Sequence, residues 1–295
     1  NGAGYVQENI TLLNGRLLAG GGLRYDEFLF NVEDRVAPPQ SGAVAARLWQ
    51  PKASLAFTPS RRVPLTLHAN YGRGISTADA RAVVQHPERP RVATTDFYQL
   101  GASHHIGRFS ATTDVFWIDR SNEQVYVPDD GTIEFKGPSR AYGYEAKASV
   151  ELSRHLALNA GLTKVANAFF RGTFPRAYVP NAPHFVANAG LTVSSWRGWS
   201  GSLRMRAINH YRLDETDPFI AASGHTVFDL GLARRLRRGV EFNLAIDNLT
   251  NRDYYETQNY FTSALQGQPS VARIHGTPGY PLTVAVGLTF RFGGK

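Results

Sequence analysis

The chain of 295 residues contains no cysteine and a single methionine. Without cysteine, a disulfide framework, a thiolate metal site and a thiol nucleophile are all excluded. No run approaches about 18 uninterrupted apolar residues, so the sequence predicts no transmembrane helix. The first five residues, Asn1 to Tyr5, include no initiator methionine and no charged or apolar leader, so we expect any secretion signal to lie outside this sequence.

Apolar and aromatic residues are plentiful. Hydrophobic residues make up 42% of the chain, which also has 13 Tyr and 17 Phe, and this excludes a disordered protein. Basic residues outnumber acidic ones by 32 to 24, which predicts an anionic partner such as lipid head groups or nucleic acid.

The strongest pattern is the alternation from Tyr280 to Phe292, in which even positions are apolar and odd positions are mainly small or polar. This period of two predicts a β-strand. At about 3.3 Å per residue its 13 residues span about 43 Å, or about 30 Å at a tilt of about 45°. A strand in a soluble sheet is usually about half as long.

The same alternation recurs at 65–72, 142–152, 199–211 and 240–247. A half-buried strand of a soluble protein alternates in the same way, so the lengths of the connections have to decide between the two classes. We predict about thirteen strands, near 4–12, 16–30, 48–58, 64–74, 94–105, 109–127, 132–152, 156–168, 184–194, 199–213, 224–235, 240–249 and 279–292.

Short turns join alternate pairs of these strands, and one of them, Asn14-Gly15, is a strong signal for a type I′ hairpin. The other connections are long and polar. Short turns at one end and long loops at the other are typical of an outer-membrane barrel. We therefore predict an all-β fold, a transmembrane antiparallel up-and-down β-barrel.

Arginines gather in or beside the short turns, and these are Arg16, Arg61, Arg62, Arg108, Arg154, Arg197, Arg237 and Arg238. Such a basic rim is favourable next to phospholipid head groups. Nucleic-acid binding would instead mix basic and aromatic residues on one surface, a pattern that is missing, so no nucleic-acid partner is expected.

Two other classes are less consistent with the sequence. The turns are spaced as in a β-propeller, but a propeller needs four short strands per repeat where this chain has two long ones. The chain has no P-loop, dinucleotide fingerprint or metalloprotease motif, so we expect no enzyme, no catalytic residues and no resident cofactor or metal.

Four short segments follow one another along the chain: LRYD at 23–26, YGRG at 71–74, YGYEA at 142–146 and DNLTNRDYYE at 247–256. In this order, and with the terminal strand, they resemble the TonB-dependent outer-membrane receptors. The resemblance extends over the whole chain.

The resemblance implies a 22-stranded barrel around an N-terminal plug domain, in the outer membrane of a Gram-negative bacterium. Residues 1–295 would be the C-terminal portion of the barrel domain, about thirteen of its strands, with the short turns in the periplasm. The plug and the TonB box are absent from this sequence, and Phe292 is followed by Gly293, Gly294 and Lys295 where the family usually ends on an aromatic residue.

The function implied is TonB-energised uptake of a large scarce solute, of the ferric siderophore, cobalamin or oligosaccharide class. The partners implied are outer-membrane lipid, the TonB complex and an extracellular ligand such as a metal chelate. A self-contained porin-like barrel of 12 to 14 strands, passing solutes by diffusion, is the alternative. An odd strand number argues against closure, whereas pairing of the first and last strands would favour the porin.

Three histidines are candidates for ligand contact near the extracellular mouth. A turn centred on Arg197 sets His184 opposite His210, and continuing the pairing across the next loop sets His210 opposite His225. Neutral imidazoles on neighbouring strands could contact a ferric chelate or a transition metal.

Below the histidines, the same pairing sets Arg206 opposite Asp229 and Asp229 opposite Asp247, where an arginine could hold the carboxylates of a ligand. Tyr254 and Tyr255 lie in a long loop that could meet the ligand from outside. Plain solvation of a water-filled interior explains the polar wall residues equally well, and the register across the loop is open to a slip of two.

Overall fold

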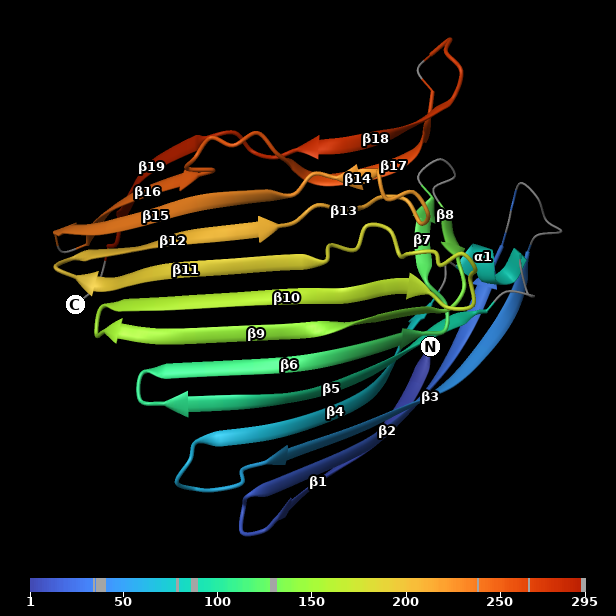
Figure 1. The fold of residues 1–295 in the computed structure, drawn as a ribbon, viewed down its shortest axis with the longest axis horizontal. Helices are drawn as coiled ribbons and strands as arrows, with labels where there is room; N and C mark the ends of the chain where they lie inside the picture. The colour runs from blue at the N-terminus through green and yellow to red at the C-terminus, as the bar shows by residue number, and fades with distance from the viewer. Residues whose placement is uncertain are drawn as a thin grey trace.

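The computed structural model describes residues 1–33, 35, 41–77, 80–85, 90–127, 132–237, 239–264 and 266–292. Its main feature is one sheet of 13 antiparallel strands, in which each strand pairs with the next one along the chain within the sheet (Figure 1). The predicted strand number and the antiparallel up-and-down order are therefore confirmed.

The strands of the sheet are long, and most exceed ten residues. Their bounds are β1 (Gly2–Leu12), β2 (Leu17–Val32), β3 (Gly42–Phe57), β4 (Leu65–Thr77), β5 (Val92–Ile106), β6 (Phe109–Arg120), β9 (Ser139–Ser153), β10 (Leu156–Phe170), β11 (Phe185–Trp196), β12 (Trp199–Ile208), β15 (His225–Arg237), β16 (Val240–Asp247) and β19 (Thr283–Phe290).

The connections separate the sheet into a short-turn end and a long-loop end, at the left and right of Figure 1. The predicted hairpin at Asn14-Gly15 joins β1 and β2, with φ of 55° at Asn14 and 83° at Gly15. Both values lie in the left-handed region that a type I′ turn requires, and asparagine and glycine tolerate it.

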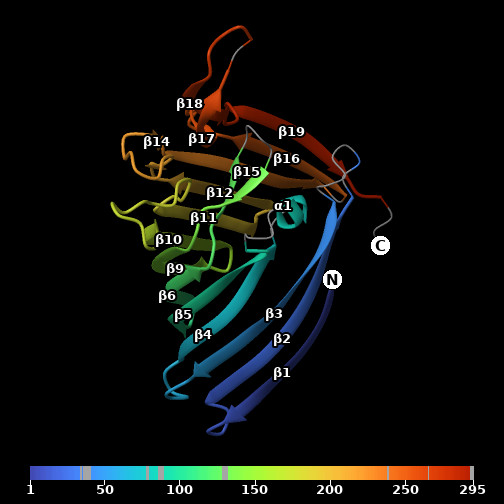
Figure 2. The ribbon, with the colours of Figure 1, turned by 90° about the vertical axis from the view of Figure 1, so that its right-hand side faces the viewer.

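The sheet is curved like a letter C (Figure 2). A short helix, α1 (Ala80–Gln85), lies on the concave side and contacts β2 and β3. Phe30 and Val83 form a small buried cluster there, with exposed fractions of 8% and 3%. Since side chains alternate along each strand, this contact and the strand pairing assign every residue of the sheet to a concave or a convex face.

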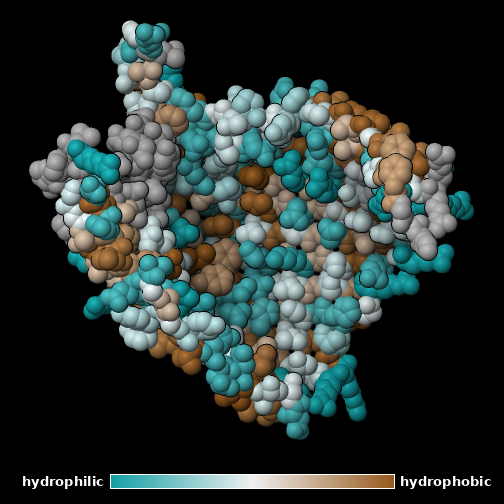
Figure 3. Space-filling model, turned by 180° about the vertical axis from the view of Figure 1, so that it is seen from behind, coloured by the Kyte–Doolittle hydropathy of each residue, from teal (hydrophilic) through white to brown (hydrophobic). Residues whose placement is uncertain are grey.

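The convex face of β19 is apolar. In β19, Val284, Val286, Leu288 and Phe290 are all more than half exposed, and they occupy the positions that the sequence pattern assigns to an outward face. The concave face, seen in Figure 3, carries large hydrophilic areas between its apolar ones. Much of the hydrophobic content therefore covers the outside of the sheet, as a lipid-facing strand requires.

Three small hairpins at the long-loop end were not predicted, nor was α1. They pair β7 (Gln124–Val127) with β8 (Thr132–Phe135), β13 (Tyr211–Arg212) with β14 (Ala221–Ala222), and β17 (Tyr255–Ser263) with β18 (Val271–Pro278).

The prediction that two strands of the sheet cover 109–127 and 132–152 is wrong at their loop ends. β6 ends at Arg120, and β9 begins at Ser139. The buried carboxylate of Glu123 accepts hydrogen bonds from Arg120 and from the hydroxyl of Ser139, the latter at 2.5 Å. These contacts close the loop at its base, so the chain beyond them pairs with itself as β7 and β8.

The topology also bears on the alternative folds. One continuous sheet of 13 strands is not divided into the blades of a β-propeller. β1 and β19 lie at opposite edges of the sheet, so the pairing that would favour a porin does not occur between them. Among the described residues, no helix has both the length and the apolar character needed to cross a membrane.

The two edges generate a prediction. β1 and β19 each pair on one side, with β2 and β16, which leaves a row of backbone groups on the other side. In hydrocarbon every such group must find a partner. We expect residues 1–295, expressed alone, to aggregate or to fail to insert into bilayers. The test is heat-modifiable migration in a detergent gel, where a stable monomeric band would contradict the expectation.

Candidate ligand site at the long-loop end

Five polar side chains come together on the concave side of the sheet at the long-loop end. Arg206 comes from β12, His225 and Asp229 come from β15, and Tyr254 and Glu256 come from the segment after β16. We call these five residues the mouth cluster. Four of them were candidates on sequence grounds, and Glu256 was not.

Arg206 is at the centre of the mouth cluster. Its Nε lies 3.4 Å from the carboxylate of Asp229, and its Nη1 lies 3.4 Å from that of Glu256. Asp229 is 5% exposed and also lies 4.0 Å from a guanidinium nitrogen of Arg204. The carboxylate of Asp229 is thus buried and paired, whereas Arg206, about half exposed, keeps donors that an anionic ligand can reach.

His225 and Tyr254 form the apolar side of the cluster. Their ring centroids are 4.6 Å apart, and His225 is buried. Burial raises the pKa of the Tyr254 hydroxyl; the Glu256 carboxylate adds to this rise, and the Arg206 guanidinium opposes it. The hydroxyl therefore stays protonated, and within the cluster its hydrogen-bond partners are Glu256 and Arg206.

Asn248 holds the segment that delivers Tyr254 and Glu256. It is 1% exposed, and its side-chain amide donates to the carbonyl oxygens of Arg252 at 2.9 Å and Tyr280 at 3.0 Å. Its amide oxygen accepts the backbone N–H of Arg252, and its own N–H donates to Asp229 at 3.1 Å. With φ of 51°, Asn248 also occupies the left-handed region. Both Asn248 and Glu256 belong to the segment 247–256, which is the sequence signal that identifies them.

The predicted register across the loop before β15 is wrong by two residues. His225 lies opposite Ile208, and Asp229 lies opposite Arg204. A side chain on Gly224 would come within 2.7 Å of the backbone of residues 208–210, so only glycine allows this close approach and sets the register there. Arg206 still reaches Asp229, because it is the diagonal neighbour on the same face.

The other candidates lie at the edge of the cluster or away from it. His184 precedes β11 and is partly buried, His210 follows β12 and is exposed, and Tyr255 is 48% exposed. Burial lowers the pKa of His184, and the nearby Lys164 and Arg212 lower it further. The three histidines do not form one row, because His225 lies opposite Ile208 instead of His210 and its ring packs against that of Tyr254.

Asp247 lies one residue beyond the last pair between β15 and β16, in which Leu230 opposes Ile246. The described part of the chain contains no group of three or more His, Cys, Asp or Glu side chains that could hold a metal ion.

A second polar feature of the concave wall was missed on sequence grounds. His68, Gly101, Asp114 and Glu145 are direct neighbours on four adjacent strands, and His68 Nε2 lies 2.5 Å from the Asp114 carboxylate across Gly101. A Cβ on Gly101 would lie 2.1 Å from that carboxylate, so only glycine fits beneath this contact. The sequence shows only that each of these strands has a polar face, and this does not reveal that His68 and Asp114 come into contact.

The arginines of the predicted basic rim lie in the short turns as far as the structure describes them. Arg61, Arg62, Arg108, Arg154 and Arg197 are at that end, and Arg61 donates to the backbone of Asn14. The side chain of Arg237 and the whole of Arg238 fall outside the described residues.

A family described as "TonB dependent receptor-like, beta-barrel" matches residues 1–249. The chain belongs to this family of TonB-dependent receptor barrels. The family consists of receptors and transporters of the Gram-negative outer membrane, not of enzymes. No curated protein matches the chain in sequence.

Solved structures of this family share the fold. The copper transporter OprC matches with a TM-score of 0.76 and 19% identity over 98% of this chain and 47% of its own. The ferric-catecholate import receptor Fiu from Escherichia coli K12 matches with a TM-score of 0.71 and 18% identity over 98% and 44%. The ferric preacinetobactin receptor BauA from Acinetobacter baumannii matches with a TM-score of 0.70 and 17% identity over 98% and 42%. The TonB-dependent receptor chain thus spans less than half the length of each of these proteins.

Asn248 provides a test of how the mouth cluster is held. We expect Asn248→Ala to destabilise the complete receptor by about 2–4 kcal/mol, because it leaves buried backbone groups without partners. Asn243→Ala is the matched control, since the Asn243 amide makes one exposed hydrogen bond, to Thr289 at 2.9 Å. The measurement is the temperature at which the detergent-solubilised receptor loses its folded band, and equal transitions in both variants would contradict this role of Asn248.

Proposed function

We propose that residues 1–295 form part of the barrel wall of an outer-membrane receptor. This receptor takes up a large, scarce, anionic metal chelate with energy supplied through TonB. The observation that carries this proposal is the mouth cluster, which places the half-exposed Arg206 beside the partly buried Tyr254 on the concave side of a sheet of this family. The capture surface is the mouth cluster together with the surrounding long loops.

The chemistry of the cluster supports an anionic ligand with an aromatic or apolar part. The exposed part of Arg206 can hold a carboxylate or catecholate oxygen. Tyr254 supplies a protonated hydroxyl and a ring face beside it. Ferric chelates are named for two of the similar structures, Fiu and BauA, and copper for a third, OprC. A ferric siderophore combines the negative charge and the size that this surface suits.

The orientation follows from the same proposal. The long-loop end faces the outside of the cell and the short-turn end faces the periplasm, where the basic rim meets phospholipid head groups. The convex face contacts the lipid of the outer membrane. In this proposal the energy for uptake comes from the TonB complex.

Energised uptake separates this proposal from passive diffusion. We expect cells that express the complete receptor to accumulate radiolabelled ferric chelate from a nanomolar supply, and to stop when TonB is deleted or the proton gradient is dissipated. A panel of ferric catecholate, ferric hydroxamate and ferric citrate identifies the class. Accumulation that continues without TonB would indicate a passive pore and would contradict the proposal.

Arg206 gives a residue-level test. We expect Arg206→Gln to weaken binding of the transported chelate about tenfold, the effect of losing one charge-assisted contact of about 1.4 kcal/mol. Arg234→Gln is the control, because Arg234 stacks on Trp199 near the short-turn end, 4.8 Å from the ring centroid. Binding is measured by ligand titration on the purified receptor. Equal affinities in both variants would remove Arg206 from the ligand site.

The histidines are tested in the same assay. The triple substitution of His184, His210 and His225 by alanine is expected to lower uptake. If uptake by the triple variant equals that of the unmodified receptor, the histidines serve only solvation and packing.

A further inference from the structure

The convex face carries a continuous row of aromatic side chains near the long-loop end. Tyr71, Tyr98, Trp117 and Tyr142 are direct neighbours on β4, β5, β6 and β9. Ring centroids are 5.0 Å apart in the Tyr71–Tyr98 pair and again in the Trp117–Tyr142 pair. An aromatic row of this kind marks the boundary between hydrocarbon and the polar layer of a membrane.

A charged row lies directly above the aromatic one, toward the long-loop end, with the order Arg73, Asp96, Asp119, Arg140 on the same four strands. Each arginine holds its neighbouring aspartate through Nε and Nη2, at 2.9 and 2.9 Å in the first pair and at 2.7 and 2.9 Å in the second.

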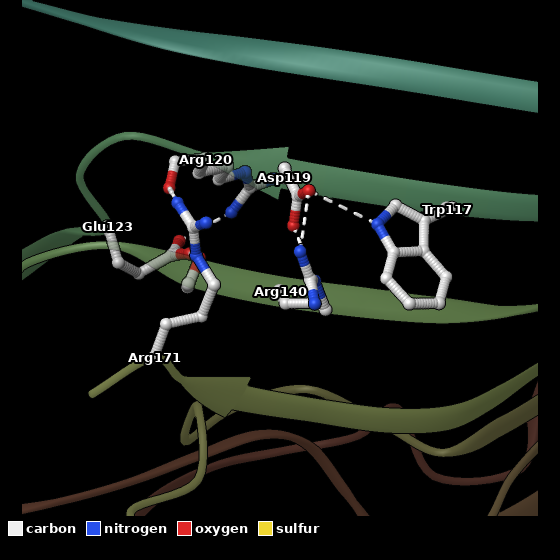
Figure 4. Close-up of polar contacts among 7 residues, drawn as sticks. Trp117, Asp119, Arg120, Glu123, Arg140 and Arg171 are labelled. Atoms are coloured by element: carbon white, nitrogen blue, oxygen red, sulfur yellow. Dashed lines mark hydrogen bonds and ion pairs between the residues drawn. The ribbon is translucent and has the colours of Figure 1, made fainter. Parts of the chain in front are cut away.

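The aspartates are also held from below. The hydroxyl of Tyr71 donates to Asp96 at 2.8 Å, and Trp117 Nε1 donates to Asp119 at 3.2 Å. Both carboxylates therefore have hydrogen-bond partners, and Arg140, which lies 4.5 Å over the Trp117 ring, uses only Nε and Nη2 in its pair and keeps the N–H donors of Nη1 (Figure 4).

Two further arginines stand beside Arg140. Arg171 follows β10, and its Nη2 donates to the carbonyl oxygen of Arg120, the residue next to Asp119, at 3.5 Å (Figure 4). Arg176 lies 4.7 Å over the ring of Phe169, which is the strand neighbour of Arg140. Both are exposed, and neither forms an ion pair with an acidic residue in the described part of the chain. Arg140 and Arg171 thus act on the same aspartate, and Arg176 adds a third guanidinium over the neighbouring Phe169 ring.

An apolar groove of about 580 Å³ runs just below these arginines, toward the short-turn end. Its convex-face lining consists of Ala69, Tyr98, Leu100, Val115, Trp117, Tyr142 and Tyr144. The groove thus begins at Trp117 and Tyr142, the two rings that lie next to Arg140.

The level of the groove matches a membrane. From Phe109 at the start of β6 to Trp117 there are eight residue steps, about 27 Å along the strand and about 20 Å in height at a tilt of about 40°. The apolar band of an outer-membrane barrel is about 25 Å tall, so the arginines sit at the head-group level of the leaflet on the long-loop side.

We propose that this surface binds one phosphate-bearing membrane lipid, with the phosphate on Arg140, Arg171 and Arg176 and an acyl chain in the groove between Tyr98 and Tyr144. The inference rests on the proposed location in the outer membrane, but not on the solute that is transported. Along the membrane normal, the arginines lie at the head-group level and the apolar groove lies below them, as the head group and acyl chains of a lipid do. This arrangement favours a lipid over a soluble anion.

Lipid binding to the complete receptor in maltoside detergent, read by native mass spectrometry, tests the proposal. The probes are phosphatidylglycerol and an uncharged galactosyl lipid with the same acyl chains. We expect the receptor to prefer phosphatidylglycerol, and Arg171→Gln/Arg176→Gln to lower that affinity about tenfold while leaving the uncharged lipid unaffected. Arg140→Gln/Asp119→Asn, which removes a whole ion pair, is expected to act in the same direction.

The control is Arg24→Gln/Asp26→Asn, a bidentate pair of the same kind on the concave face, with distances of 2.7 and 2.8 Å. It is expected to leave phosphatidylglycerol binding unchanged. The proposal is overturned if the arginine variants bind phosphatidylglycerol as the unmodified receptor does, or if both lipids bind the receptor equally. Displacement of the lipid by inorganic phosphate at the same concentration would indicate a free-anion site and would also overturn it.

The transport assay is an independent readout. If the receptor shows no lipid selectivity but energised uptake is intact, only the lipid site is contradicted. If energised uptake is absent but lipid selectivity is intact, only the proposed function is contradicted. A lower folded-state transition temperature in Arg140→Gln/Asp119→Asn with unchanged lipid affinity assigns the charged row to strand pairing, against the proposal.

Discussion

The antiparallel hydrogen-bond ladder is the constraint on which the rest of this structure depends. It pairs the backbone of 13 neighbouring strands and forces side chains to alternate between two faces. A slip of one residue anywhere would exchange the lipid-facing and lumen-facing sets. The register shifts between Leu156 and Ala157 and between Arg235 and Arg237 lie near strand ends, whereas the shift between Val165 and Asn167 exchanges the faces of even and odd positions in the last part of β10.

The fold was predictable because its signals are local. The period of two, visible from Tyr280 to Phe292, needs no knowledge of distant residues, and the Asn14-Gly15 turn specifies its own hairpin. Where a short turn joins two strands, the register follows as well, so that Val186 lies opposite Ile208 as a turn centred on Arg197 requires. The strand number and the two faces could therefore be predicted from the sequence.

The candidate site was harder to predict from the sequence, because the register of two strands does not follow from the sequence when a long loop joins them. The position of His225 depends on how Gly224 packs against residues 208–210, a contact that no periodicity reveals. Glu256 joins Arg206 only because Asn248 folds the segment back over the wall. The charged row of the convex face was also hidden, because Asp96 and Asp119 interrupt an apolar pattern and their ion pairs depend on residues of neighbouring strands.

The small helix α1 has a consequence for how a solute would enter. It covers β2 and β3 from the concave side with an apolar cluster around Phe30 and Val83, while the charged side chains of the mouth cluster stand on β12 and β15, far across the sheet. The concave face at the long-loop end is thus apolar near β2 and β3 and charged near β12 and β15. Under the proposed function, a solute with one charged end and one apolar end would be oriented by this difference as it approaches.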